Sequence, residues 1–248
     1  MKKYLLATTV AAALCAAAPA FAQPTGYIGF SDSQAHVKAM GVKDDGNTVT
    51  VDGTFLFPIQ ENAFVKLDGN IDDVDGDTMG GVTAHVGTRF GGGLVAGFVG
   101  AANVDDEAAY SAGVEGQFYP ADNATLAGTL GYSKIDDEDL NIWNASVEGR
   151  YFVSDNFRLN ANLGYLRADV SGENGDGWDA GLGAEYQLAN TPLSFFGGYN
   201  YVKSDDADLT ANVWTLGFRM NFNGSLKDRD RSGAGLSGTS SVSNALLF

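Results

Sequence analysis

The sequence predicts an all-β protein, an antiparallel up-and-down transmembrane β-barrel of about twelve strands, with ten strands as the alternative. Three observations lead to this fold class. Long segments alternate apolar and polar side chains with a period of two. Short turns alternate along the chain with acidic segments, and 33 glycines stand beside only five prolines. Such a composition favours strands and turns over helices.

The first 22 residues have the features of a cleaved signal peptide. Lys2 and Lys3 precede an apolar stretch from Tyr4 to Ala18, and Ala20-Phe21-Ala22 is a small-x-small cleavage pattern. The apolar stretch is shorter than the roughly 20 residues of a spanning helix, which disfavours a membrane anchor. We therefore expect the mature chain to start at Gln23.

Lipidation at Cys15 is the other possible fate of this segment. A lipoprotein site needs a small residue before its cysteine, whereas Leu14 occupies that position here. Without residues 1–22 the chain has no cysteine, so disulfide and thiol chemistry are excluded.

Charge and hydrophobicity exclude further classes. After loss of the signal peptide, 13 basic residues remain against 31 acidic ones, a formal charge of −18 that phosphates would repel, so we expect no nucleic acid partner. At 44% hydrophobic and 11% aromatic residues, the chain is too apolar for intrinsic disorder. Its length fits one all-β domain.

The alternation is clearest in residues 141–153, 156–166 and 178–188. One face of the first segment carries Trp143, Val147 and Tyr151, and the other carries Glu148 and Arg150. Such runs of roughly 10 to 14 residues exceed the average of about five or six in globular strands. Strands of this length with aromatic ends match a tilted membrane crossing. The barrel must close, because lipid cannot satisfy an open sheet edge.

The breaks between strands are of two kinds, which predicts the topology. Short turns lie at residues 58–62, 91–93, 120–123, 154–156 and 189–192, and acidic loops at 43–47, 72–77, 105–107, 136–139, 172–177 and 204–208. Short periplasmic turns and longer external loops are the outer-membrane arrangement. The expected strands start near Tyr27, Thr48, Ala63, Thr78, Leu94, Ala109, Ala124, Asn141, Asn156, Gly177, Leu193 and Ala211.

The last expected strand resembles the assembly signal of outer-membrane barrels, with Thr215, Gly217, Met220 and Phe222 at the matching positions. Residues 25–222 resemble small porin-like outer-membrane proteins of Gram-negative bacteria. The resemblance implies an outer-membrane location among lipid and lipopolysaccharide, and recognition by the barrel assembly machinery. The signal usually ends the chain, whereas 26 residues follow Phe222 here. The barrel is therefore expected over 23–222, and residues 223–248 are expected to form a flexible Gly/Ser-rich periplasmic tail.

The alternation also assigns residues to the lumen. The charged candidates are Asp52, Lys66, Asp68, His85, Arg89, Glu115, Glu148, Arg150, Arg158, Asp179, Glu185 and Arg219. Acids and bases are nearly balanced, which suits either ion pairs in a closed structural barrel or the wall of a narrow water-filled pore. Inward glycines, among them Gly113 and Gly217, are expected to leave space. The favoured hypothesis is a channel for passive diffusion of small solutes.

A membrane-embedded hydrolase is the third hypothesis. Such an enzyme needs a histidine beside a nucleophile or a carboxylate. His36 has no local triad pattern and His85 has no neighbouring Ser on its strand, so we expect no catalytic residues. Residues 73–77 resemble the start of a calcium loop but lack its closing Glu, so we expect no metal site or cofactor. Weakly held divalent cations could bridge the acidic loops to lipopolysaccharide phosphates.

Overall fold

The computed structural model describes residues 24–104, 107–135, 140–170, 173–204, 206 and 208–236. The predicted signal peptide, the acidic loop at 136–139 and the end of the predicted tail lie outside these residues.

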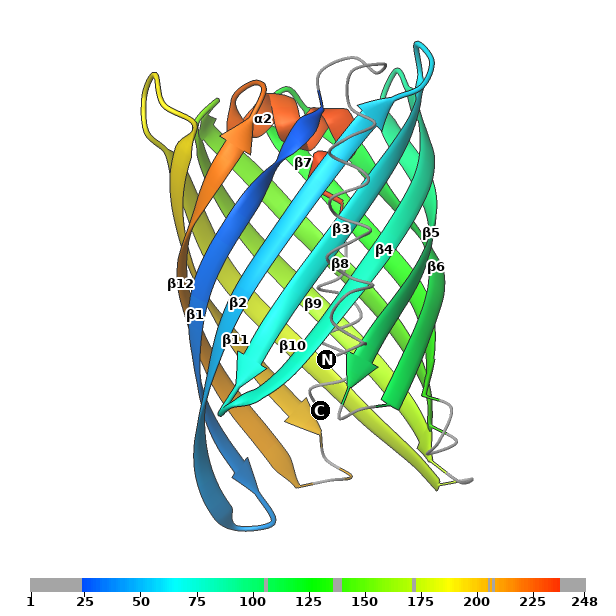
Figure 1. The fold of residues 1–248 in the computed structure, drawn as a ribbon, viewed down its shortest axis with the longest axis vertical. Coiled ribbons are helices and arrows are strands. Elements are labelled where there is room, and N and C mark those ends of the chain that lie inside the picture. The colour runs from blue at the N-terminus through cyan, green and yellow to red at the C-terminus, as the bar shows by residue number, and fades with distance from the viewer. Residues whose placement is uncertain are drawn as a thin grey trace.

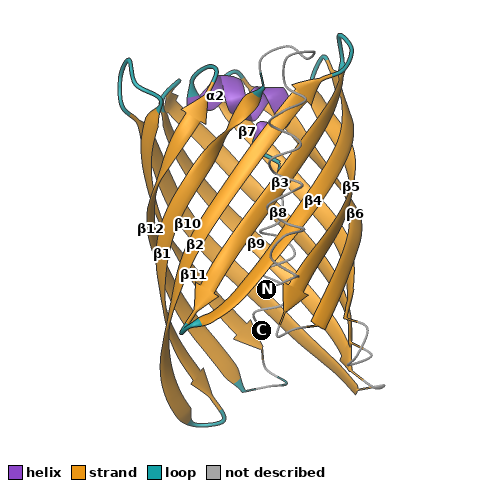
Figure 2. Ribbon diagram, in the orientation of Figure 1, coloured by secondary structure: helices purple, strands orange, loops and turns teal. Residues whose placement is uncertain are grey.

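Twelve strands form a single closed barrel, as predicted, and each strand pairs antiparallel with its neighbours in the chain (Figures 1 and 2). The strands are β1 (Thr25–Ala39), β2 (Val42–Pro58), β3 (Ala63–Val74), β4 (Asp77–Phe90), β5 (Gly93–Val104), β6 (Glu107–Ala121), β7 (Ala124–Ile135), β8 (Leu140–Ser154), β9 (Phe157–Val170), β10 (Glu173–Gln187), β11 (Leu193–Ser204) and β12 (Leu209–Phe222). The barrel closes where β1 pairs with β12, from Gly26 opposite Phe222 to Ala39 opposite Leu209.

The apolar face of each strand points outward, as the alternation predicts. Val147, Tyr151, Leu163 and Leu182 all have exposed side chains, whereas the residues between them face the interior. The apolar side chains that would form the core of a soluble protein therefore lie on the outer surface of this barrel, where they suit contact with lipid.

The acidic segments are less loop-like than predicted. Residues 43–47 belong to β2, and the first hairpin turns instead at Met40 and Gly41, whose φ angles are 49° and 81°. The second acidic segment turns only at Asp75 and Gly76, with φ angles of 51° and 101°. Acidic side chains are poor strand formers, but backbone pairing with the neighbouring strand keeps these residues in extended hairpins.

The chain after β12 is also different from the prediction. Residues 226–236 are not a flexible tail but form the short helix α2 (Leu226–Arg229) and the π-helical turn η2 (Asp230–Ala234), which lie at the short-turn end of the barrel (Figure 1). Leu226, Ala234 and Leu236 are buried, so this segment is held by packing that sequence periodicity does not report. Neither helix in the described ranges is long and apolar enough to cross a membrane.

Candidate functional site

The candidate site is the barrel lumen. All twelve charged residues predicted to face it lie on the strand face opposite to the exposed apolar side chains. Lys66, Asp68, His85, Glu115, Arg150 and Glu185 are buried, and Asp52, Arg89, Glu148, Arg158, Asp179 and Arg219 are partly buried. The structure brings most of these residues together into two ion-pair networks on different parts of the wall.

The first network connects β3, β4 and β6. Lys66 Nζ donates to Asp68 Oδ2 at 2.6 Å, and His85 Nε2 lies 2.7 Å from the same oxygen. His85 Nδ1 contacts Glu115 Oε1, and Thr54 Oγ1 donates to Asp68 Oδ1 at 2.6 Å. The imidazole therefore lies between the carboxylates of Asp68 and Glu115, and each ring nitrogen is within contact distance of one of them.

The second network connects β9, β10, β11 and β12. Glu185 Oε2 accepts from Arg158 Nη2 at 3.0 Å and from Arg219 Nη1 at 2.9 Å, and Glu185 Oε1 accepts from Ser194 Oγ at 2.7 Å. The Arg219 guanidinium also lies over the ring of Phe196 at 4.2 Å. These pairs satisfy charge in a confined space and hold the arginines against the wall.

Two further candidates differ in their partners. Asp179 accepts from Asn162 Nδ2 at 2.8 Å, so its carboxylate belongs to an amide cluster and not to an ion pair. Asp52 lies against Gly29, where a β-carbon on the glycine would come within 2.3 Å of the Asp52 carboxylate.

The inward glycines do not leave open space, contrary to the prediction. A β-carbon on Gly113 would lie 2.5 Å from the ring of Phe98, and one on Gly217 would lie 2.5 Å from the ring of Phe196. Gly164 is covered in the same way by the carboxylate of Asp179. Each of these glycines makes room for a neighbouring side chain that covers it. The width of the lumen at these positions therefore depends on the covering side chain and not on the glycine.

The C-terminal residues 225–236, here called the plug segment, enter this lumen from the short-turn end. Asn223 and Gly224 have φ angles of 54° and 81°, which reverse the chain after β12. Ser225 then caps α2: its hydroxyl accepts from the backbone N–H of Asp228 at 3.1 Å, and Asp228 accepts from the backbone N–H of Ser225 at 3.0 Å. This reciprocal capping box starts the helix directly after the turn.

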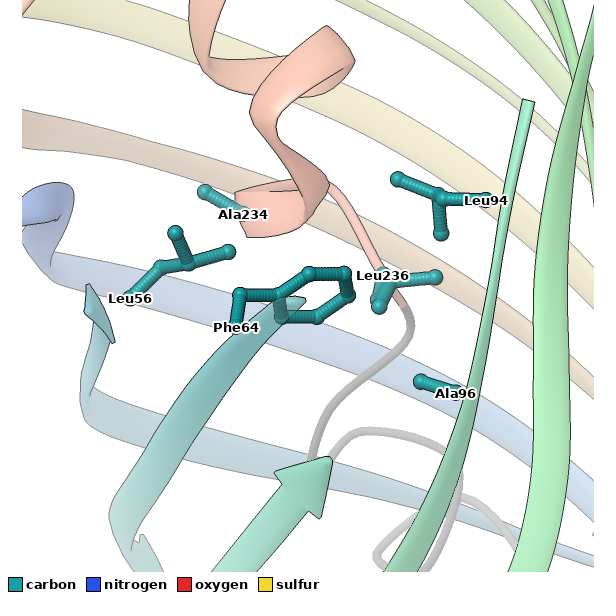
Figure 3. Packing of buried hydrophobic residues seen from close by; sticks show 6 residues of the cluster. All are labelled: Leu56, Phe64, Leu94, Ala96, Ala234 and Leu236. Carbon is teal, nitrogen blue, oxygen red and sulfur yellow. The ribbon is translucent and has the colours of Figure 1, made fainter. Parts of the chain in front are cut away.

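Apolar packing holds the plug segment against one side of the barrel. Figure 3 shows Leu56, Phe64, Leu94 and Ala96, from β2, β3 and β5, around Ala234 and Leu236. Because these wall residues face inward, they would line the lumen with apolar surface if the plug segment were absent. Their burial favours the docked position.

Polar contacts hold the plug segment against the rest of the wall. Asp230 accepts from Arg150 Nη1 at 2.5 Å and from Thr125 Oγ1 at 2.6 Å. The carbonyl oxygen of Ser232 accepts from Arg89 Nη2 at 2.6 Å, and Arg229 Nη2 donates to Gln187 Oε1 at 3.1 Å. Together with the apolar contacts, the plug segment touches inward residues of β2, β3, β4, β5, β7, β8 and β10, and thus spans the lumen.

Backbone and side-chain contacts with the short turns complete the docking. Arg231 Nη2 donates to the carbonyl oxygens of Ala121 and Ala124 at 2.9 and 3.0 Å. Lys227 Nζ lies 2.6 Å from Asp155 Oδ1, and this pairing raises the pKa of the Lys227 ammonium. The hydrogen bonds from the backbone and side chain of Ser225 lower the pKa of Asp228.

Sequence reasoning missed the plug segment, although three signals mark it. Asn223-Gly224 is a turn pair, and Ser225-Leu226-Lys227-Asp228 is a capping-box pattern. In addition, the turn-side ends of β2, β3 and β5 carry apolar residues on both faces, at 55–57, 63–65 and 94–96. A strand that is apolar on both faces needs a partner inside the barrel.

The four predicted assembly-signal residues lie on β12. Thr215 and Gly217 face the lumen, where Thr215 Oγ1 is 2.8 Å from Ser33 Oγ. Met220 is exposed on the outer face, and Phe222 stacks with Phe55 at a centroid distance of 5.8 Å. The two apolar residues therefore face lipid at the short-turn end of the closing strand.

His36, the other histidine of the chain, lies outside the lumen on β1. His36 is exposed and its Nδ1 lies 2.7 Å from Asp45 Oδ1. Within the described part of the chain, no group of three or more His, Cys, Asp or Glu side chains is placed to hold a metal ion.

Comparison with solved structures finds barrels of similar fold among outer-membrane proteins. An outer membrane channel from Pseudomonas putida F1 superposes with a TM-score of 0.63 and 10% sequence identity, covering 83% of this chain and 98% of that one. The KdgM porin in complex with disordered oligogalacturonate gives a TM-score of 0.57 at 8% identity, covering 79% and 99% of the two chains. The translocator domain of the autotransporter NalP from Neisseria meningitidis gives 0.53 at 15% identity, covering 89% and 96%. At these identities the likeness is one of fold.

Sequence comparison identifies the family. No curated protein matches the chain. A family model described as Gram-negative porin, however, matches residues 32–227, which comprise most of the barrel and the start of the plug segment. The chain therefore belongs to the Gram-negative porin family, and it is an outer-membrane β-barrel channel for small solutes.

Proposed function

We propose that this porin is a narrow passive channel whose periplasmic mouth is restricted by its own C-terminal residues. The observation that carries the proposal is the plug segment, which contacts inward side chains on both sides of the lumen. Its contacts at Asp230 and Ser232 use the charges of Arg150 and Arg89 that would otherwise line the entrance. The polar wall beyond these contacts provides the path for hydrated solutes.

The matched test removes different lengths of the C-terminus. A chain ending at Gly224 keeps all of β12 and its assembly signal but lacks the plug segment, whereas a chain ending at Leu236 keeps the plug segment. Single-channel conductance in planar bilayers should rise several-fold in the shorter chain and stay at the full-length level in the longer one. Equal conductance of all three proteins would show that the plug segment does not restrict the pore.

A purely structural role of the plug segment is the second candidate, because its apolar contacts and buried ion pairs also suit a permanently filled mouth. The same experiment separates the two roles. If the chain ending at Gly224 folds, as heat-resistant electrophoretic migration reports, yet its conductance stays at the full-length level, the proposal of a restricted mouth fails and the structural role remains.

We further propose that the chain is not an enzyme. Both ring nitrogens of His85 contact carboxylates, and His36 is exposed beside Asp45, so neither imidazole has the environment of a general base next to a nucleophile. His85→Gln should therefore change folding or conductance only. Hydrolysis of lipid or peptide substrates by the wild type that is lost in His85→Gln would contradict the proposal.

Two partners follow from the same architecture. The lipid-facing Met220 and Phe222 on the closing strand support recognition of β12 by the barrel assembly machinery, and Phe222→Ala should lower the folded fraction in vivo. The exposed acids Asp73, Asp75 and Asp77 support weak binding of divalent cations at the external rim. Chelation of these ions should loosen the association with lipopolysaccharide without unfolding the barrel.

A further inference from the structure

The three tryptophans of the chain lie on one side of the barrel. Trp143, Trp178 and Trp214 occupy the successive return strands β8, β10 and β12, and all three are exposed on the outer face. Their ring centroids lie 4.6 to 5.4 Å from those of Tyr132, Tyr201 and Tyr199 on the outgoing strands beside them. Paired aromatic rings on the outer face form one row at the level where lipid headgroups meet the acyl chains.

On each of the outgoing strands β7, β9 and β11, a basic residue lies just beyond an outward tyrosine, toward the acidic end of the barrel. Two positions after an outward tyrosine come Lys134 on β7, Arg167 on β9 and Lys203 on β11, in the segments Tyr132-Ser133-Lys134, Tyr165-Leu166-Arg167 and Tyr201-Val202-Lys203. Residues two apart share a strand face, so each base points outward about 7 Å nearer the acidic end than its tyrosine. The register also sets Arg167 opposite Trp143 and Lys203 opposite Trp178.

The outer rim of the six strands β7 to β12 carries these three tryptophans and three bases, and we call it the aromatic–basic arc. The other outward bases of the strands are Lys38 and Lys43, opposite each other in the β1–β2 hairpin. The bases nearer the short turns, from Lys66 to Arg219, all face the lumen. The acidic end of the barrel thus directs its strand bases away from its own lumen and toward the membrane.

The arc contains a hollow on the outer face. A cavity of about 590 Å³ is lined by Tyr132, Asn141, Trp143, Arg167, Asp169 and Asn174. Its lining thus combines two aromatic rings with the guanidinium of Arg167, two amides and one carboxylate. Asp176, across from Arg167 in the register, accepts from the Tyr165 hydroxyl at 2.9 Å and so fixes the tyrosine beside the hollow.

We propose that the aromatic–basic arc binds a phosphorylated glycolipid of the outer leaflet. Along each outgoing strand, toward the acidic end, the arc presents apolar side chains, then a tyrosine, then a base, which matches acyl chains, sugar rings and phosphates in the same order. The guanidinium of Arg167 can pair with a phosphate through two donors, and the rings of the hollow pack against a sugar. The lipid chemistry, not a soluble anion, fits because the bases lie on the lipid-facing surface.

Native mass spectrometry of the purified full-length protein tests this binding. The protein is titrated with bisphosphorylated lipid A, with dephosphorylated lipid A, and with inorganic phosphate alone. Bisphosphorylated lipid A should bind at least about tenfold more tightly than the dephosphorylated form, since only its phosphates can pair with the bases of the arc. Inorganic phosphate should leave no adduct. Equal binding of both lipids, or an adduct with phosphate alone, would overturn the proposal.

Charge-removing variants locate the site. Lys134→Gln/Arg167→Gln/Lys203→Gln should lose the preference for the phosphorylated lipid, whereas Lys38→Gln/Lys43→Gln, which removes outward bases outside the arc, should keep it. If the triple variant fails to migrate as a folded barrel, Arg167→Gln alone should weaken binding several-fold. Unchanged binding in the folded variants, or a lipid-free dimer formed through the arc, contradicts the proposal. Conductance should be the same in all these variants, so the result is separate from the test of the channel.

Discussion

Arg150 and Asp230 form a buried ion pair at 2.5 Å between the wall of the barrel and the plug segment. Arg150 belongs to β8, and its second amino group binds Glu148 at 2.5 Å. Asp230 has Thr125 as its other partner. The pair therefore joins the C-terminal residues to a charge network that already belongs to the lumen.

Asp230→Asn should undock the plug segment. Leaving one partner of a buried pair without its counter-charge costs about 3 kcal/mol, which lowers the docking equilibrium roughly a hundredfold. We expect longer-lived high-conductance events in planar bilayers. Asp77→Asn at the opposite end of the barrel is the control and should behave as the wild type; a matching rise in that control would place the effect elsewhere.

Acidification should loosen the same segment through its helix cap. Hydrogen bonds from the backbone and hydroxyl of Ser225 hold the pKa of Asp228 below its ordinary value of 3.8. A lowered pKa means that the ionised carboxylate stabilises the docked state, fully above about pH 4, and that this contribution is lost as the pH falls through the lowered pKa. Conductance should therefore rise in acid in the wild type. Asp228→Asn should show the higher conductance already at neutral pH and a smaller acid step.

The two faces of β9 should differ in their tolerance of charge. Leu163 is 58% exposed on the outer face, whereas its neighbour Asn162 faces the lumen and donates to Asp179. Leu163→Arg should destabilise the barrel by about 2–4 kcal/mol near the bilayer midplane. Asn162→Arg should cost far less, because Asp179 can accept the added charge. Urea titration of both proteins in detergent or lipid measures the difference, and equal losses would argue against a lipid-facing Leu163.

The acidic end of the barrel should face outside the cell. Met40→Cys and Asp75→Cys place thiols at two hairpin turns of this end, and Asn190→Cys places one at a short turn. On intact cells an impermeant thiol reagent should label the first two and not the third. The reverse pattern would invert the topology.

The exposed acids should give a weak cation preference that salt removes. Asp44, Asp45, Asp73 and Asp75 are exposed, so their potential is screened within about 10 Å at 0.1 M salt. Reversal potentials should show cation selectivity at low salt that fades near 1 M, and replacing the four by Asn should reduce it. Anion selectivity in the wild type would assign control to Arg158 and Arg219 instead.

Periodicity predicted the barrel because lipid on one side and water on the other act on every strand alike. The alternation around Trp143 and Leu163 therefore reports the outward face directly, and the inward positions of Lys66, His85 and Arg150 follow from it. This alternation does not show which side chains of the lumen pair with one another. Nothing in the sequence shows that Glu185 binds two arginines or that His85 lies between two carboxylates, because these partners come from different strands.

The plug segment escaped prediction for a different physical reason. Composition suggested flexibility, since the C-terminal residues are rich in glycine and serine. Their order depends instead on the inward apolar surface of Leu56, Phe64 and Leu94, which belongs to strands more than a hundred residues earlier. The hairpin around Met40 was misplaced because acidic residues usually mark loops, whereas cross-strand pairing carries residues 43–47 into β2.

The pairing of β1 with β12 makes the first strand depend on the last. Thr25 to Ala39 can complete one of its two ladders with β2 alone, but its other edge stays open until Leu209 to Phe222 are available. An open edge of this length is a template for aggregation. The exported chain must therefore be kept from other chains until its C-terminal strand has arrived, and any truncation that removes β12 leaves a sheet that no arrangement of the remaining strands closes in the same register.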